Sequence, residues 1–256
     1  MKTKSHVRFF SRVSHLDADI ELVDVIKILS CNGELHEQNE TSKNKIFKYV
    51  NKQQHPILWE RKPNEHNRKI AISHLKSTIC ESFIKNIYEN FTLYLSEILQ
   101  SAAKNGLNPE RLIGEHNVNF TANEVLTTVQ ESKADGIINL VAKSVFRKLE
   151  NEKSTKNLLK KFNDKLNLEV SEESINKALP FLEIRHLLVH NDGKVDNKFR
   201  DSYPSFNYYN ISKKSITLKL DYTLLSAVRD SIYTLVNEFD KKIVDNNIVH
   251  KTELQP

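Results

Sequence analysis

The chain has 256 residues, 39% of them hydrophobic, and its 38 Lys and Arg against 33 Asp and Glu give a formal net charge of +5. This length and apolar content provide one globular core and exclude a fully disordered chain. Only 5 Gly and 6 Pro interrupt the sequence, which favours long helices over a turn-rich β-sandwich or barrel. The basic excess favours a polyanionic partner such as RNA or DNA, although a generally lysine-rich composition explains it equally well.

The N-terminal segment and the cysteines indicate the cellular compartment of the protein. Residues 1–17 carry charges where a signal peptide has its apolar segment. No apolar run approaches the about 20 residues that cross a bilayer. Cys31 and Cys80 stand far apart without metal-type spacing, so we expect reduced thiols that act as small buried hydrophobic residues. The sequence therefore predicts a soluble, cytoplasmic protein without a membrane partner.

The first half of the chain predicts two helices. Residues 15–30 place apolar side chains at helical spacing and end at an Asn-Gly pair. Residues 34–65 turn polar, apart from a short segment between two prolines that we expect to pack through Ile57, Leu58 and Trp59. Residues 66–104 form the strongest pattern, with an apolar residue at every fourth position. They predict one buried helix of about 35 residues, or ~50 Å.

The second half predicts shorter helices and one excursion into β-structure. We expect a loop over 107–121, one or two helices over 122–151, and an amphipathic helix over 155–168 with a lysine-rich outer face. Such a face is typical of any solvated helix. We favour this interpretation over a surface that binds nucleic acid.

After this helix, Ser171 predicts a short helical turn. Pro180 predicts the start of a helix over 180–191 that stops at Gly193. Residues 215–220 alternate like one strand of a hairpin, and 222–243 form the last helix.

These elements predict a single all-α domain over residues 1–256. It is an up-and-down helical bundle with its core in 66–245, a long central helix, and a small β excursion near 212–220. Residues 1–65 add an N-terminal helix and an irregular extension.

One segment concentrates ionisable groups among leucines: "FLEIRHLLVHNDGKVDNKF", residues 181–199. It carries Arg185, His186 and His190 within one apolar helix. Arg followed five positions later by His occurs twice more in the chain, but proline or glycine interrupts both of those pairs. Burying Arg and His costs several kcal/mol unless a partner compensates, so this third pair points to a function.

This segment resembles the HEPN superfamily, whose hallmark is Arg, a polar residue, three further residues and then His near the end of an α-bundle. The resemblance in helix order covers about 66–245, and its specific part is about 180–199. It implies a metal-independent endoribonuclease without cofactors that cleaves single-stranded RNA and leaves a 2',3'-cyclic phosphate. His190 is then the acid–base group and Arg185 grips the phosphate, which agrees with the chemistry of imidazole and guanidinium.

The resemblance also implies partners and supporting residues. Five residues turn an ideal helix by ~500°, so Arg185 and His190 lie about 140° apart and do not face one spot. In the family two such helices meet across a symmetric dimer, so we expect a homodimer. We expect His186 to orient the Arg, the phosphate or His190, and the Asn191 and Asp192 turn to support the site. His186 and His190 share a face, but no third ligand stands at zinc-site spacing, so no metal is expected.

Basic and aromatic residues follow the motif and are candidates to bind RNA: Lys198, Arg200, Tyr203, Lys213 and Lys214. Ordinary packing of a hairpin explains the aromatic residues as well. For the motif itself, the alternative is that Arg185 pairs with Glu81 or Glu89 while His190 caps the helix. A toxin or phage-defence effector with a cognate antitoxin is one reading of the whole chain. A non-catalytic module that binds RNA, a nucleotide or a protein is the other.

Overall fold

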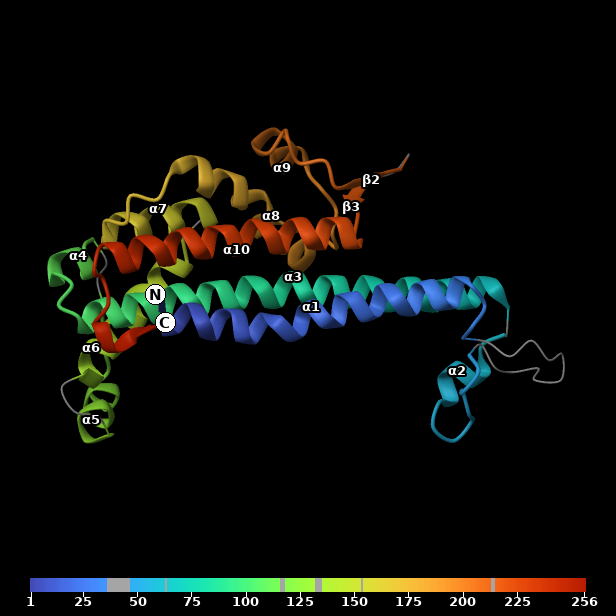
Figure 1. Cartoon of the computed structure of the whole chain (residues 1–256), viewed down its shortest axis with the longest axis horizontal. Coiled ribbons are helices and arrows are strands. Elements are labelled where there is room, and N and C mark those ends of the chain that lie inside the picture. The colour runs from blue at the N-terminus through green and yellow to red at the C-terminus, as the bar shows by residue number, and fades with distance from the viewer. Residues whose placement is uncertain (36–46, 63, 116–117, 132–134, 153, 213–214) are drawn as a thin grey trace.

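The computed structural model describes residues 1–35, 47–62, 64–115, 118–131, 135–152, 154–212 and 215–256. It is an all-α fold with a small β excursion, as the sequence predicts (Figure 1). The main helices are α1 (Lys4–Cys31), α3 (Glu65–Lys104), α6 (Asp135–Glu150), α7 (Thr155–Leu166), α8 (Glu172–His190) and α10 (Tyr222–Asp245). Shorter helices are α2 (Pro56–Glu60), α4 (Pro109–Ile113), α5 (Ala122–Glu131), α9 (Asn197–Ser202) and the 3-10 turn η1 (Lys251–Glu253).

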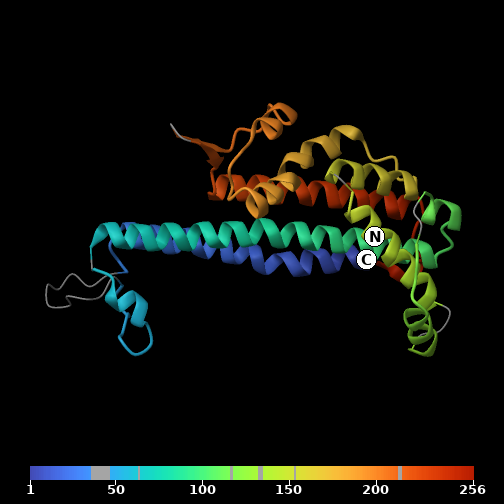
Figure 2. The ribbon, with the colours of Figure 1, turned by 180° about the vertical axis from the view of Figure 1, so that it is seen from behind.

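The predicted long helix is α3, which has 40 residues and therefore spans about 60 Å. Asn64 caps its start by accepting a hydrogen bond from the Asn67 backbone N–H at 2.8 Å. Asn105 follows its last turn, and Gly106 adopts a φ of +87°, a conformation that glycine reaches without strain. α1 runs antiparallel beside α3 along most of this length (Figures 1 and 2).

A second layer covers one end of the α1–α3 pair. There α6, α8 and α10 pack on α3, and α7 packs on α6 and α8 (Figures 1 and 2). The core side chains come chiefly from α3, α8 and α10, and the central stretch of α3 from Ile84 to Leu99 contributes several that are at most 1% exposed. Burial of each such side chain stabilises the fold by about 1.5–3 kcal/mol. The site described below lies on this covered half.

The two chain termini pair with each other. β1 (Lys2–Thr3) and β4 (Leu254–Gln255) form an antiparallel ladder, so both ends lie together in Figure 1. The buried Asp240 of α10 accepts hydrogen bonds from the N–H and the hydroxyl of Thr3, and Thr3 in turn caps α1. The β excursion is the hairpin of β2 (Tyr209–Ile211) and β3 (Ile216–Leu218), which confirms the predicted strand.

The predicted helix start at Pro180 is wrong. α8 begins at Glu172, where Ser171 accepts a hydrogen bond from the Ser174 N–H at 3.1 Å, and it continues through Pro180. An internal proline removes one backbone hydrogen bond and costs about 3 kcal/mol. Buried residues on both sides of it, such as Ile175 and Ile184, keep the helix continuous.

Other boundaries also differ from the sequence-based expectation. α1 begins at Lys4 rather than near residue 15, because Phe9 and Val13 are fully buried and extend the packed face towards the N-terminus. The loop expected over 107–121 contains the short helix α4. Ile57 does not pack: it is 73% exposed. Cys80 is buried as expected, but Cys31 is exposed. No described helix has the length and apolar character needed to span a bilayer.

Candidate functional site

Arg185 reaches from α8 to the long helix α3. Its guanidinium carbon lies 4.9 Å from the centre of the Tyr88 ring, which is within the range of a cation–π contact. Its Nε is buried and has no hydrogen-bond partner. Neither Glu81 nor Glu89 forms an ion pair with it, since Glu81 pairs with Lys85 and no described ion pair includes Arg185. The alternative that Arg185 is neutralised by the long helix is therefore not what the structure shows.

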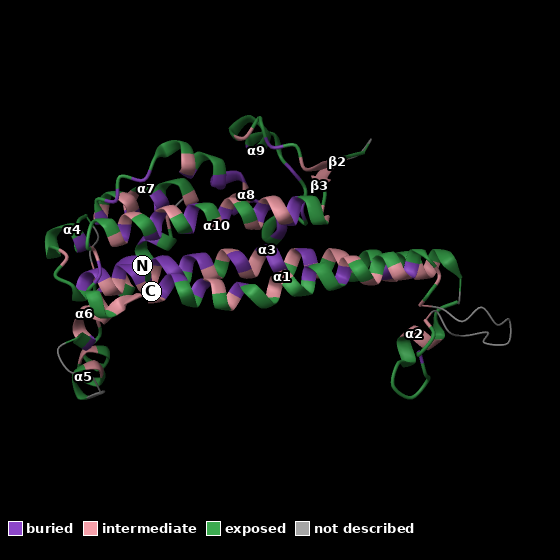
Figure 3. Ribbon diagram, in the orientation of Figure 1, coloured by how far each residue is buried: buried purple, intermediate pink, exposed green. Residues whose placement is uncertain are grey.

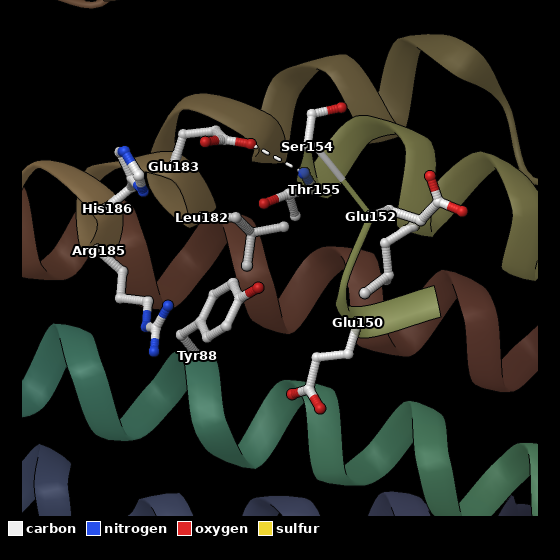
Figure 4. Close-up of a pocket in the computed structure, with 10 residues that line it drawn as sticks. Tyr88, Glu150, Glu152, Ser154, Thr155, Leu182, Glu183, Arg185 and His186 are labelled. Carbon is white, nitrogen blue, oxygen red and sulfur yellow. Dashed lines mark hydrogen bonds between the residues drawn. The ribbon is translucent and has the colours of Figure 1, made fainter. Parts of the chain in front are cut away.

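Arg185 lines a pocket of about 140 Å³ between α3, α8 and the start of α7 (Figure 4). Three carboxylates also line it, and two of them are engaged elsewhere. Glu183 accepts a hydrogen bond from the Thr155 N–H at 3.0 Å, and Glu152 pairs with Lys161 at 2.7 Å. In the view of Figure 4 the Tyr88 ring lies between the Arg185 guanidinium and the Glu150 side chain. The guanidinium therefore keeps its charge available on the pocket side.

The two histidines of the motif touch each other. The ring centres of His186 and His190 lie 4.5 Å apart, at an interplanar angle of 49°, as their i, i+4 spacing on α8 requires. Both side chains are exposed. His186 points away from Arg185 in Figure 4. Two imidazole rings, whose nitrogens can donate or accept a hydrogen bond, therefore lie side by side at the surface.

A larger groove of about 760 Å³ adjoins the Arg185 pocket. The two share Ser154, Glu183 and His186 among their lining residues, so they adjoin each other along α8, and together we call them the hollow. The far wall of the groove is α9 and the segment after it, which contribute Lys198 and Tyr203. Lys156, at the start of α7, also lines it.

The basic residues of this hollow form no ion pairs, although acidic residues line it as well. In the described part of the chain, neither Lys156, Lys198 nor Arg185 forms an ion pair. Two acidic residues line the groove, Glu183 and Asp196, and Asp196 is the N-cap of α9, where its side chain accepts the Phe199 N–H at 2.7 Å. A polyanion that enters the hollow can therefore pair with the cations without displacing an existing ion pair, but it also meets the carboxylates that line the hollow.

The turn after the motif has a structural task. Asn191 is the C-cap of α8, and its N–H bonds the Leu187 carbonyl at 3.0 Å. Asp192 and Gly193 adopt φ values of +51° and +71°, and the Gly193 carbonyl accepts the Leu218 N–H of β3 at 2.9 Å. The turn thus ties the end of α8 to the hairpin, and a further role of Asn191 and Asp192 in supporting the site stays a prediction.

The predicted RNA-binding residues divide into three groups. Lys198 and Tyr203 line the groove. Arg200 does not; its guanidinium donates to Asn197 on the same helix. Lys213 and Lys214 lie outside the described residues. Burial raises the pKa of Tyr203 to about 12, so its hydroxyl stays protonated.

The aromatic residues of this region largely pack against one another. Phe206 is buried and lies within 5.6 Å, ring centre to ring centre, of Phe181, Phe199, Tyr208 and Tyr209. The alternative of ordinary hairpin packing therefore holds for most of the stretch. Tyr203 and the buried Phe199 are the aromatic residues that also line the groove.

The structure brings Arg185 and His186 to one pocket and leaves His190 outside it. His190 lines neither the pocket nor the groove, but its ring contacts that of His186 from the next turn of α8. Sequence reasoning did not find Tyr88 as the partner of Arg185, nor Lys156 as part of the groove. Tyr88 was visible only as a flank of the apolar stripe on α3, and the spacing of Lys156 was that of any exposed helical lysine.

The site was also compared with metal centres, and the chain with known proteins. Among the described residues, no group of three or more His, Cys, Asp or Glu side chains gathers as metal ligands do. Comparison of the chain with family models, with curated proteins and with solved structures found no match. A functional assignment therefore depends on the geometry of the hollow and on the resemblance of its motif.

Proposed function

We propose that the chain is a metal-independent endoribonuclease that cleaves single-stranded RNA in the hollow along α8. One observation carries the proposal: the unpaired guanidinium of Arg185 shares a pocket with His186, whose ring touches that of His190, and this pocket adjoins a groove with unpaired lysines. The guanidinium presents a fixed pair of positively charged donors to a phosphate group, and the imidazoles can transfer protons. The lysines bind the phosphates of the neighbouring RNA backbone. The HEPN resemblance of the same residues supports the assignment.

In the proposed reaction His190 removes the proton from a ribose 2'-hydroxyl. The 2'-oxygen attacks the adjacent phosphorus, the bond from phosphorus to the 5'-oxygen breaks, and the leaving oxygen receives a proton from the second imidazole. The products are a 2',3'-cyclic phosphate and a 5'-hydroxyl. Arg185 neutralises the charge that develops on the non-bridging oxygens, a contribution that is typically worth ~10²- to 10³-fold in rate.

The Arg185–Tyr88 contact explains how a guanidinium is held ready for this task. The ring fixes the side chain without neutralising it, so the charge is preorganised and remains available to a phosphate. Glu183, which could compete for the guanidinium, is held by the Thr155 N–H. His186, which follows Arg185 on α8, lines both the pocket and the groove.

A second candidate function is a non-catalytic module that binds RNA, a nucleotide or a protein partner. Two observations favour it: three carboxylates line the Arg185 pocket, and His190 lies outside that pocket. Under this reading the hollow binds its ligand, but no group is placed to transfer a proton. A role as a toxin or phage-defence effector, with a cognate antitoxin, belongs to the first candidate and is part of that proposal.

Cleavage of unpaired RNA by the purified chain in excess EDTA separates the two candidates. We expect cleavage by the wild type and a fall of at least ~10²-fold in Arg185→Ala and in His190→Ala. His15→Ala is the matched control, because His15 is exposed on α1 far along the chain from the motif. Retention of RNA binding by all four proteins, with no cleavage by any, establishes the second candidate instead.

A further inference from the structure

Among the residues that the structure describes, no second layer of helices covers the distal part of the α1–α3 pair (Figure 1). We call residues 18–31 of α1 together with residues 65–80 of α3 the arm. At its base, Ile20 and Cys80 lie against Tyr222, the first residue of α10. Beyond that point the arm extends as two helices without cover from α10, and exposed residues predominate on it (Figures 1 and 3).

Within the arm, α1 is apolar on two sides. Val23 is buried against the neighbouring helices, whereas Val25, two residues on and therefore about 160° around the helix, is 49% exposed. Leu22 and Ile28, on the same outer side, are 57% and 52% exposed. A helix that packs on one side only normally places charged residues on the other, so this outer stripe indicates a second packing partner.

The two helices of the arm carry opposite charges. Residues 18–31 contain Asp19, Glu21 and Asp24 against Lys27, and residues 65–80 contain Arg68, Lys69 and Lys76 against Glu65. In the described structure the three carboxylates on α1 form no ion pair, and on α3 only Lys69 is engaged, with Glu65 at 2.6 Å. The arm is thus an acidic helix beside a basic one, each with charges free to meet a partner.

We propose that the arm is a homodimer interface, on which the arm of a second copy packs in antiparallel overlap. A two-fold axis across the arm places α1 of one copy beside α3 of the other, so acidic helices meet basic ones twice and the apolar stripes are covered together. The self-complementary charge pattern selects a second copy over an unrelated helix.

The apolar surface also distinguishes the arm from α8 as the dimer contact. The arm exposes Leu22, Val25, Ile28, Ile70 and Leu75. On α8, which is described in full, the exposed large hydrophobic residue is Val189. Stable interfaces need a desolvated apolar centre, and the arm offers one. This inference does not depend on the proposed function, and the two α8 hollows remain open in such a dimer.

Sedimentation velocity on the full chain tests the interface. We expect the wild type to sediment as a dimer of the 29.7 kDa chain, and Leu22→Lys combined with Ile28→Lys to shift it to monomer by weakening association ~100-fold or more. The matched control is Leu126→Lys with Val129→Lys on α5, two residues 60% and 58% exposed at the other end of the molecule. It stays dimeric.

Two outcomes overturn the proposal: a wild type that is monomeric at micromolar concentration, or an arm variant that stays dimeric. Circular dichroism establishes that each variant is folded. If the lysine variant unfolds, Leu22→Ser with Ile28→Ser replaces it, because serine removes the apolar contact without adding charge. The wild-type dimer also weakens as salt rises, since the helices attract each other by charge; a dimer indifferent to salt contradicts the proposed pairing.

Discussion

Arg185 shows how a single side chain is prepared for an anion. Its charge is half-buried, its Nε has no hydrogen-bond partner, and an aromatic ring rather than a carboxylate faces it. A structural arginine in an apolar setting normally has an acidic partner, because an uncompensated buried charge is costly. Under the proposed function, the phosphate of the RNA takes the place of that acidic partner.

Replacing Tyr88 tests this preparation without touching the charge itself. Tyr88→Leu removes the ring and is expected to weaken RNA binding by ~2- to 30-fold, the equivalent of the about 0.5–2 kcal/mol of a cation–π contact. Tyr88→Phe keeps the ring and serves as the control. Fluorescence anisotropy with a labelled single-stranded RNA measures both. Equal affinities for the two variants contradict a role for the ring.

The two cysteines differ in reactivity for a physical reason. Cys80 is 2% exposed, and burial raises the pKa of its thiol to about 11, whereas Cys31 is exposed. We expect a disulfide reagent at pH 8 to titrate Cys31 quickly and Cys80 only on unfolding. Thiol counting on the native wild type, with Cys31→Ser as the control, checks this. Rapid reaction of that control contradicts the burial of Cys80.

The same pKa predicts a loss of stability in alkali. Because the folded-state pKa lies above the ordinary value of 9.0, the thiol is favoured in the fold, and the contribution is complete below pH 9. It is lost as pH rises from about 9 to about 11, by roughly 1.4 kcal/mol per pH unit. Denaturant titrations of wild type and Cys80→Ala at pH 8 and pH 10 measure the difference. A difference between the two proteins that does not change with pH refutes it.

At the scale of elements, Lys165 fastens α4 to α7. Its ammonium donates hydrogen bonds to the carbonyls of Arg111, Leu112 and Ile113 at 3.1, 2.9 and 3.3 Å, where the last carbonyls of a helix lack partners. Lys165→Met is expected to lower the free energy of unfolding by about 1–3 kcal/mol. Lys160→Met, on the exposed side of the same helix, is expected to change it by less than about 0.5 kcal/mol. Chemical denaturation compares them, and equal effects contradict the account.

Helices whose signals are local could be predicted, and those decided by tertiary contacts could not. The stripe of α3 and its Asn-Gly stop are local, so the sequence predicts the helix almost to the residue. The start of α8 is not: propensity places a break at Pro180, but burial on both sides of it overrides the break. The early start of α1 likewise depends on Phe9 and on contacts at the far end of the chain.

The candidate site divides in the same way. The motif identifies α8 and the importance of Arg185 and His186, since a local pattern is enough to see ionisable groups on an apolar helix. It does not identify Tyr88 or Lys156, because both come from other helices and have ordinary spacing. The separation of His190 from the Arg185 pocket agrees with the arc of about 140° that five residues of an ideal helix leave between the two side chains.

At the scale of the molecule, the two halves have different tasks. The covered half buries the core, joins the termini through β1 and β4, and carries the hollow along α8. The other half is the arm, whose apolar and charged surface is left open by the residues that the structure describes. The two proposals place association and chemistry on separate halves, so we expect loss of the dimer and loss of the site to be independent.

The most direct test of the proposed chemistry is the end groups of RNA cleaved in excess EDTA. The account predicts 2',3'-cyclic phosphate and 5'-hydroxyl ends, and no cleavage of an otherwise identical strand whose riboses are replaced by 2'-deoxyribose, because the 2'-oxygen is the attacking nucleophile. Products with a 3'-hydroxyl and a 5'-phosphate, or cleavage of the deoxy strand, would contradict it.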